Sequence, residues 1–200
     1  MPSIVVAAQL VTANEEARQK IIAALSSVSQ FSKKSEPGVV RYAICVPRDE
    51  EADSSSVYVF EEYLTQSALD AHMASKPVQE ELIAYFGSNP TFFGGAPTIY
   101  TTTPVAAFER ADILSARDPV IVFSSSLANE EAAGTVQELQ RAEGVLGYGA
   151  YVDKEDGQAV KTIGVFESER AREQVAKKGE GVSLRLVGGY LGKERTAANL

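Results

Sequence analysis

The residues best suited to chemistry lie between Val57 and His72, where a strand-like run passes directly into a helix-like one. Val57 to Phe60 is β-branched and aromatic, which is typical of a buried strand. Thr65 or Ser67 can cap the helix that follows, in which apolar residues recur at spacings of three and four. The sequence therefore predicts a junction between a strand and a helix at this point.

Groups that can move protons converge at this junction. His72 is the only histidine of the chain, and histidine ordinarily titrates near neutrality, so it can serve as a general acid or base. Glu61, Glu62 and Tyr63 stand at the end of the strand. We predict that His72 and Tyr63 are catalytic. A histidine on an apolar helix face can equally be a core residue with satisfied nitrogens, and that interpretation stays open.

Composition excludes several classes of protein. The 200 residues are 44% hydrophobic, which is enough for one sizeable core or two small ones. Acidic residues outnumber basic ones by 27 to 19, so neither nucleic acid nor an anionic membrane is an expected partner. The beginning of the sequence lacks a basic leader, and no apolar run reaches about 20 residues. With Cys45 as the only cysteine, we expect a soluble, cytoplasmic protein without an internal disulfide.

The elements of the first hundred residues follow from hydrophobic periodicity. Strands are predicted at residues 4–11, 39–46, 57–60 and 98–103. Thr12 and Glu15 form a capping-box pattern, which predicts a helix that ends before Pro37. A short amphipathic turn is expected after Pro77. The resulting order of strand, helix, strand, strand, helix and strand is the split βαβ arrangement.

This arrangement occurs twice. Residues 129–132 repeat residues 14–17 letter for letter, residues 144–148 echo 38–42, and residues 165–167 echo 59–61. The last two echoes are both displaced by 106 positions, which predicts that the second hairpin has kept its length. On this alignment Lys178 matches His72, and Glu169 matches Tyr63.

The repeat predicts an α+β fold of two ferredoxin-like (βαββαβ) halves. We place the first half at residues 1–104, a connector at 105–117 and a degenerate second half at 118–195. A half of this size with one bare sheet face is poorly stable alone, so the two halves are expected to bury those faces on each other.

Residues 4 to 104 resemble the antibiotic biosynthesis monooxygenase family. The resemblance rests on Glu36-Pro-Gly-Val-Val-Arg-Tyr42, on a strand ending Glu-Glu-Tyr63, on a helix with Ala-Leu and Ala-His, and on Lys76-Pro77. Tyr63 stands where the family often has tryptophan. The resemblance implies a dimeric α+β barrel with a small-molecule cleft beside the second helix. Here one chain would form it as an intrachain pseudo-dimer, and a further homodimer stays open.

The family also implies an activity, which is the oxygenation of an electron-rich aromatic without a cofactor. The substrate would be a phenol, a hydroquinone or a polyketide-type ring of secondary metabolism or quinone turnover, and O2 would be the second partner. Such chemistry needs a base, donors that hold the substrate anion, and dry walls. Besides the catalytic pair, the predicted substrate-binding residues are Tyr42, Tyr58, Phe60, Met73 and Phe86.

The sequence predicts neither a metal nor an organic cofactor. One histidine and one cysteine cannot complete a closed zinc site. Some relatives on this fold degrade haem with a histidine late in the second helix, where this chain has Leu82 and Ile83. Two alternatives remain open: a non-catalytic small-molecule-binding or pathway-accessory barrel, and a cyclase, isomerase or decarboxylase on the same fold.

Overall fold

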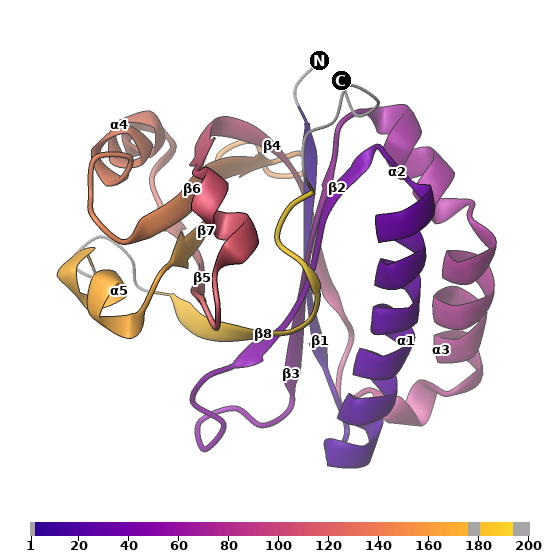
Figure 1. Cartoon of the computed structure of the whole chain (residues 1–200). Coiled ribbons are helices and arrows are strands. Elements are labelled where there is room, and N and C mark those ends of the chain that lie inside the picture. Colours follow the sequence, from indigo (N-terminus) through magenta and orange to yellow (C-terminus); the bar gives the residue numbers. More distant parts are fainter. Residues whose placement is uncertain (1–2, 176–180, 194–200) are drawn as a thin grey trace. The chain divides into compact units, whose positions relative to one another are not determined.

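The computed structural model describes residues 3–175 and 181–193, and it contains two compact units (Figure 1). The first unit holds the described residues up to 99 together with 187–193, and the second holds those between 100 and 186. Eight strands pair in the order β1-β3-β2-β8-β5-β7-β6-β4, which is a closed barrel. The predicted α+β fold with two ferredoxin-like repeats is confirmed. Within the described ranges, no helix is long and apolar enough to cross a membrane.

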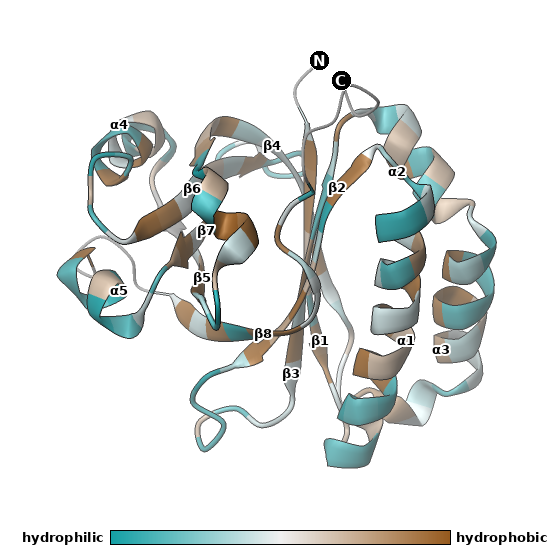
Figure 2. Ribbon diagram, viewed as in Figure 1, coloured by the Kyte–Doolittle hydropathy of each residue, from teal (hydrophilic) through white to brown (hydrophobic). Residues whose placement is uncertain are grey.

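In the first unit, strand β3 lies between β1 and β2 and pairs antiparallel with both. Helices α1, α2 and α3 lie on one side of this sheet (Figure 1). Brown, hydrophobic segments run along the strands, whereas α1 mixes brown and teal as an amphipathic helix should (Figure 2). The bounds are β1 (Ile4–Val11), α1 (Glu15–Ser35), β2 (Val39–Pro47), β3 (Ser56–Tyr63), α2 (Gln66–Met73), the π-helical segment η1 (Val78–Ala84), α3 (Tyr85–Ser88) and the 3-10 turn η2 (Pro90–Phe92).

Alternation along β3 divides its side chains between the two faces of the sheet. Val57, Val59 and Tyr63 belong to the same apolar cluster as the inward side chains of α1, so they face the helices. Tyr58 and Phe60 therefore point to the opposite face. This division decides which of the predicted residues can meet His72.

One of the two predicted helix caps is wrong. The N-cap of α1 is Asn14, whose side-chain oxygen accepts from the Ala17 N–H at 2.9 Å. Thr12 still belongs to the strand region, because it forms a bridge with Phe93 and its hydroxyl donates to the Ser55 carbonyl at 2.7 Å. The cap predicted at Thr65 is confirmed for α2.

The second unit repeats this pattern with β4 (Thr98–Glu109), the 3-10 turn η3 (Ala111–Ser115), β5 (Val120–Leu127), α4 (Asn129–Leu139), β6 (Val145–Asp153), β7 (Val160–Phe166), α5 (Glu169–Val175) and β8 (Val182–Tyr190). Residues 105–109 of the predicted connector are part of β4, most of them paired with β6. The domain limits drawn from the sequence stay a prediction.

The predicted length of the second hairpin is wrong. Tyr42 pairs with Glu61 in the first unit, and Tyr148 pairs with Gly164 in the second. Tyr148 lies 106 positions after Tyr42, but Gly164 lies only 103 positions after Glu61. The second hairpin is thus three residues shorter than the first. The prediction failed because it relied on repeated residues, whereas backbone pairing decides which residues face one another.

The end of β8 belongs to the first unit, where it lies very close to β2. Gly189 has a φ of 80°, and a Cβ atom added there would lie 1.9 Å from the Tyr42 carbonyl oxygen. Only glycine fits both the left-handed conformation and this approach.

We therefore expect Gly189→Ala to lower the free energy of unfolding by at least about 2 kcal/mol. The matched control is Gly87→Ala, because a Cβ at Gly87 meets nothing within 4 Å. The control should change stability by less than about 1 kcal/mol. Urea unfolding of both variants checks this, and equal stabilities would contradict the close approach of β8 to β2.

Candidate functional site

His72 is held between the end of α1 and the sheet. It lies on α2 and is only 2% exposed. Its Nδ1 lies 2.7 Å from Oε2 of Glu36, the residue that ends α1, and 3.2 Å from the Ser32 hydroxyl. That hydroxyl also donates to the Glu36 carboxylate. The His72–Glu36 pair therefore ties α2 to the last turn of α1.

The pair fixes which imidazole nitrogen is the base. Burial opposes ionisation of Glu36, but hydrogen bonds from His72 and Ser32 outweigh it and hold the pKa of Glu36 below its ordinary value. An ionised carboxylate can only accept hydrogen bonds, so Nδ1 of His72 carries a proton. In the neutral ring, Nε2 is then the nitrogen that can take up a proton.

A second carboxyl group, that of Glu61, lies on the face of β3 that points toward the helices and His72. Tyr63 donates its hydroxyl to Glu61, and Tyr42 stands opposite Glu61 on β2. Glu61 keeps some exposed surface as a residue, yet burial of its carboxyl raises its pKa, against the opposing effects of His72 and the two tyrosines. Glu36 and Glu61 thus flank one histidine with pKa values moved in opposite directions.

The two tyrosines complete the surroundings of His72. Their ring centroids lie 5.9 Å (Tyr42) and 5.5 Å (Tyr63) from that of His72. Burial, and then Glu61, raise the pKa of both hydroxyls, so both remain donors at neutral pH. The Tyr42 hydroxyl is buried and makes no hydrogen bond of normal geometry, although the Glu61 carboxyl is close enough to raise its pKa. A buried hydroxyl without a well-formed hydrogen bond can donate to a ligand.

The structure brings together three of the seven site residues predicted from the sequence: His72, Tyr63 and Tyr42. Of the other four, only Phe86 packs against the apolar cluster that contains Tyr42 and Tyr63. Tyr58 and Phe60 point to the opposite face of β3, so their predicted part in substrate binding stays a prediction. The remaining two lie farther out on the helix side: Met73 is 44% exposed, and Phe86 packs on Phe93 at 5.4 Å between centroids.

Sequence reasoning missed Glu36, Glu61 and Ser32 as members of the site. Two signals were available. Glu36 opens the Glu-Pro-Gly motif, and Glu61 stands two positions before Tyr63, which in a strand places both on one face. Among the residues that the structure describes, no three His, Cys, Asp or Glu side chains are grouped to hold a metal ion.

The second unit provides an internal comparison for this cluster. Ser168 caps α5 as Thr65 caps α2, through the backbone N–H three residues on. A Cβ at Gly144 would collide with Ala171 at 2.5 Å, and one at Gly38 would collide with Ala68 at 2.6 Å. These matches align α5 with α2 at a displacement of 103 positions, which is also the displacement between β3 and β7.

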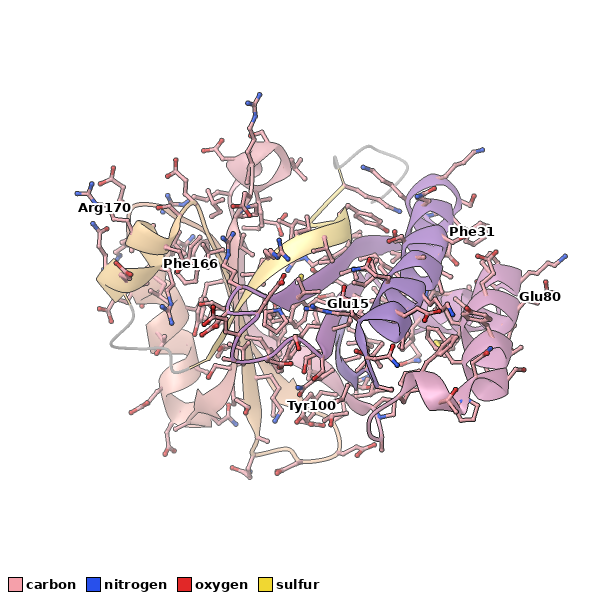
Figure 3. The ribbon with its side chains drawn as sticks, turned by 90° about the horizontal axis from the view of Figure 1, so that it is seen from below. Glu15, Phe31, Glu80, Tyr100, Phe166 and Arg170 are labelled. Carbon is pink, nitrogen blue, oxygen red and sulfur yellow. The ribbon has the colours of Figure 1, made fainter. Side chains whose placement is uncertain are left out.

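Four members of the polar cluster have apolar counterparts in the second unit, whereas Tyr42 is matched by Tyr148. The counterparts of Glu36, Glu61, Tyr63 and His72 are Ala142, Gly164, Phe166 and Val175. The assignment of Glu169 to Tyr63 was therefore wrong, and Lys178 lies outside the described residues. The rings of Phe166 and Tyr148 fill the space at Gly164, where a Cβ would meet them at 2.7 and 3.0 Å. Figure 3 labels Phe166 in the interior of this unit and Arg170 at its outer edge.

Comparisons with known proteins agree with this fold. Residues 4–80 match the model of the antibiotic biosynthesis monooxygenase family. A candidate monooxygenase of Fusobacterium nucleatum has a TM-score of 0.73 at 12% identity, over 98% of this chain and 99% of its own. A candidate monooxygenase from Lactobacillus acidophilus NCFM has a TM-score of 0.68 at 12% identity, over 97% of this chain and 100% of its own. An anthrone oxidase-like protein has a TM-score of 0.65 at 10% identity, over 98% of this chain and 97% of its own. No protein of curated function matches the sequence. At these identities the likeness establishes the fold.

The two carboxyl groups predict opposite dependences of stability on pH. Glu36 has a lowered pKa, so its stabilising effect is present above the ordinary pKa of glutamate and is lost as the pH falls through the lowered value. Glu61 has a raised pKa, so its contribution is present below the ordinary pKa and is lost as the pH rises through the raised value.

We therefore expect Glu36→Gln to be destabilised most at pH 7 and less in acid. Glu61→Gln should gain on the wild type as the pH rises from about 4 to 8, because an amide cannot ionise. Glu62→Gln is the matched control: it removes an ion pair with Arg41 on the other face of β3 and should show no such gain. Thermal unfolding across this pH range measures all three, and parallel curves for Glu36→Gln and Glu61→Gln would contradict the opposite shifts.

Proposed function

We propose that the protein is a cofactor-independent monooxygenase, because residues 4–80 match the model of the antibiotic biosynthesis monooxygenase family. Its substrate is an electron-rich aromatic, namely a phenol, a hydroquinone or a polyketide-type ring, and O2 is the oxidant. The observation that carries the proposal is the pairing of buried His72 with half-buried Glu36, with its 2.7 Å contact between Nδ1 and Oε2.

His72 is the base in this proposal. Nε2 takes a proton from the substrate, and the ionised Glu36 on the other nitrogen stabilises the imidazolium that forms. The resulting anion needs a hydrogen-bond donor, and the Tyr42 hydroxyl, which makes no hydrogen bond of normal geometry, supplies one. Tyr63, already bound to Glu61, keeps that carboxyl oriented beside the histidine.

The reaction balances without an outside reductant. The substrate anion passes one electron to O2, and the two radicals combine into a peroxide on the substrate carbon. Breaking the O–O bond with loss of water leaves one oxygen atom in the product. The other oxygen leaves in water together with two substrate hydrogens, so the substrate itself supplies both electrons that reduce this oxygen.

Substrate access requires movement on the helix side of the sheet, because His72 is almost fully buried. The adjoining segment favours such movement. Helix α2 has only eight residues, and the π-helical segment η1 follows soon after it. Segments of π-helix hydrogen-bond less regularly than α-helix and are frequent at functional sites.

A second candidate function uses the same pair without oxygen. A histidine oriented by a carboxylate can shuttle a proton within one substrate, as a cyclase, isomerase or decarboxylase requires. A binding or pathway-accessory barrel would use the Tyr42 hydroxyl only to hold a ligand.

Oxygen dependence separates these candidates. The protein, treated with a metal chelator, is incubated with anthrone, simple hydroquinones and polyphenols under 18O2 and under argon. Anthrone is included because one structural neighbour is described as anthrone oxidase-like. We expect one O2 consumed per substrate, one labelled oxygen atom in the product, and no turnover under argon. Equal turnover under argon would establish the oxygen-free enzyme, and binding without turnover would establish the accessory barrel.

His72→Gln should keep the fold and lower turnover at least about tenfold, because a general base typically contributes 10² to 10⁴ in rate. Tyr42→Phe should lower turnover by a similar order if its hydroxyl holds the anion. The matched control is Tyr148→Phe, the same change at the equivalent position of the second unit, and it should leave turnover unchanged. Full activity of His72→Gln on a confirmed substrate would refute the assignment of the base.

A further inference from the structure

The last described residues of the chain return to the first unit and contact the end of α1. The Tyr190 hydroxyl donates to the Val39 carbonyl at 3.2 Å, and Arg41 Nε donates to the Leu191 carbonyl at 2.9 Å. These contacts bring the segment that follows β8 alongside the start of β2. Lys193 stands at the end of this segment.

Lys193 binds the same two residues that hold His72. Its Nζ donates to the carbonyl oxygens of Ser32 and Glu36, at 2.8 Å in both cases. The side chains of these two residues are the ones that contact Nδ1 of His72. Each carbonyl also accepts one backbone N–H, Ser32 from Glu36 and Glu36 from Val39, so Lys193 adds a second bond to each. A lysine is a favourable partner for the carbonyl groups at the end of a helix.

We propose that Lys193 is a positioning residue that fixes the backbone of Ser32 and Glu36, so that their side chains hold the His72 imidazole in one orientation. This inference deepens the proposed function and rests on it for its catalytic meaning. The geometric claim can be tested without any substrate, because both carbonyl contacts belong to the resting protein.

The charges around Lys193 are consistent with this role. Burial lowers the pKa of Lys193, while the neighbouring Glu36 carboxylate opposes that effect. The lysine in turn helps to keep the pKa of Glu36 low, after the larger contributions of His72 and Ser32. Removing the lysine should therefore loosen the carboxylate that orients His72.

The chain supplies a matched control in Lys33. The ammonium groups of Lys33 and Lys193 both lie over the ring of Tyr190, at 5.7 and 5.2 Å from its centroid. Only Lys193 bonds to the carbonyl groups of the His72-holding residues. Loss of Lys33 removes a similar charge from the same ring and leaves those bonds intact.

The test reads the imidazole directly, because His72 is the only histidine. In the full-length protein labelled with 15N-histidine, we measure exchange of the Nδ1 proton with solvent. Lys193→Met should accelerate this exchange at least about tenfold, because local opening controls such exchange. Lys33→Met and the conservative Lys193→Arg should stay within about twofold of the wild type. If Lys193→Met fails to fold, Lys193→Gln, whose shorter side chain cannot bridge both carbonyls, takes its place.

Unchanged exchange in Lys193→Met, or equal acceleration in Lys33→Met, would overturn the proposal. On a confirmed substrate, Lys193→Met should lower kcat several-fold and leave KM within about twofold, since misplacement of a catalytic group costs rate. Faster exchange in a protein that turns over no aromatic would support the positioning role and refute the monooxygenase assignment.

Discussion

The contact between His72 and Glu36 is the constraint on which the rest of the site depends. Removing a carboxylate from water, even partly, is costly unless it is paired and hydrogen-bonded, and half-buried Glu36 is held by both Nδ1 of His72 and the Ser32 hydroxyl. These contacts fix α2 against the last turn of α1. Once His72 is fixed, the alternation of β3 brings Glu61 and Tyr63 to it, and the pairing of β2 with β3 adds Tyr42.

The second unit shows what the fold does without this constraint. Replacing a buried ion pair by well-packed apolar residues is often neutral or stabilising, whereas a half-satisfied polar network is worse than either. The second unit has lost both carboxyl groups and the histidine, with Ala142, Gly164, Phe166 and Val175 at the positions of Glu36, Glu61, Tyr63 and His72, and it keeps Tyr148 at the position of Tyr42. The fold therefore does not require the polar cluster, and its presence in the first unit is better explained by chemistry than by stability.

The sequence predicted the fold well and the site only in part, for physical reasons. Hydrophobic periodicity and the repeat are properties of whole segments, so they survive errors at single positions. The match of Val-Phe-Glu at 165–167 to 59–61 misled because one repeated tripeptide cannot fix strand register. The sequence did not reveal that Tyr58 and Phe60 point away from His72, because both faces of β3 are buried, and composition alone does not then show which face lies under the helices. Lys193 carries no local signal, since its contacts lie about 160 positions away.

In the proposed reaction, the two carboxyl groups around His72 divide the work of proton transfer between them. Glu36 is kept ionised by its hydrogen bonds, so it can orient the imidazole and stabilise its charged form, but it is a poor proton acceptor. Glu61 has a raised pKa and lies beside the same ring, so it ionises closer to neutrality and can exchange a proton more readily. Pairs of titratable groups whose surroundings move their pKa values apart are the usual mark of assigned acid and base roles. A histidine kept only for packing would need neither carboxyl group. A histidine that served only in an ion pair would need one carboxyl group, not two. In the proposed mechanism, the presence of both gives the proton taken up at His72 a path onward through Glu61.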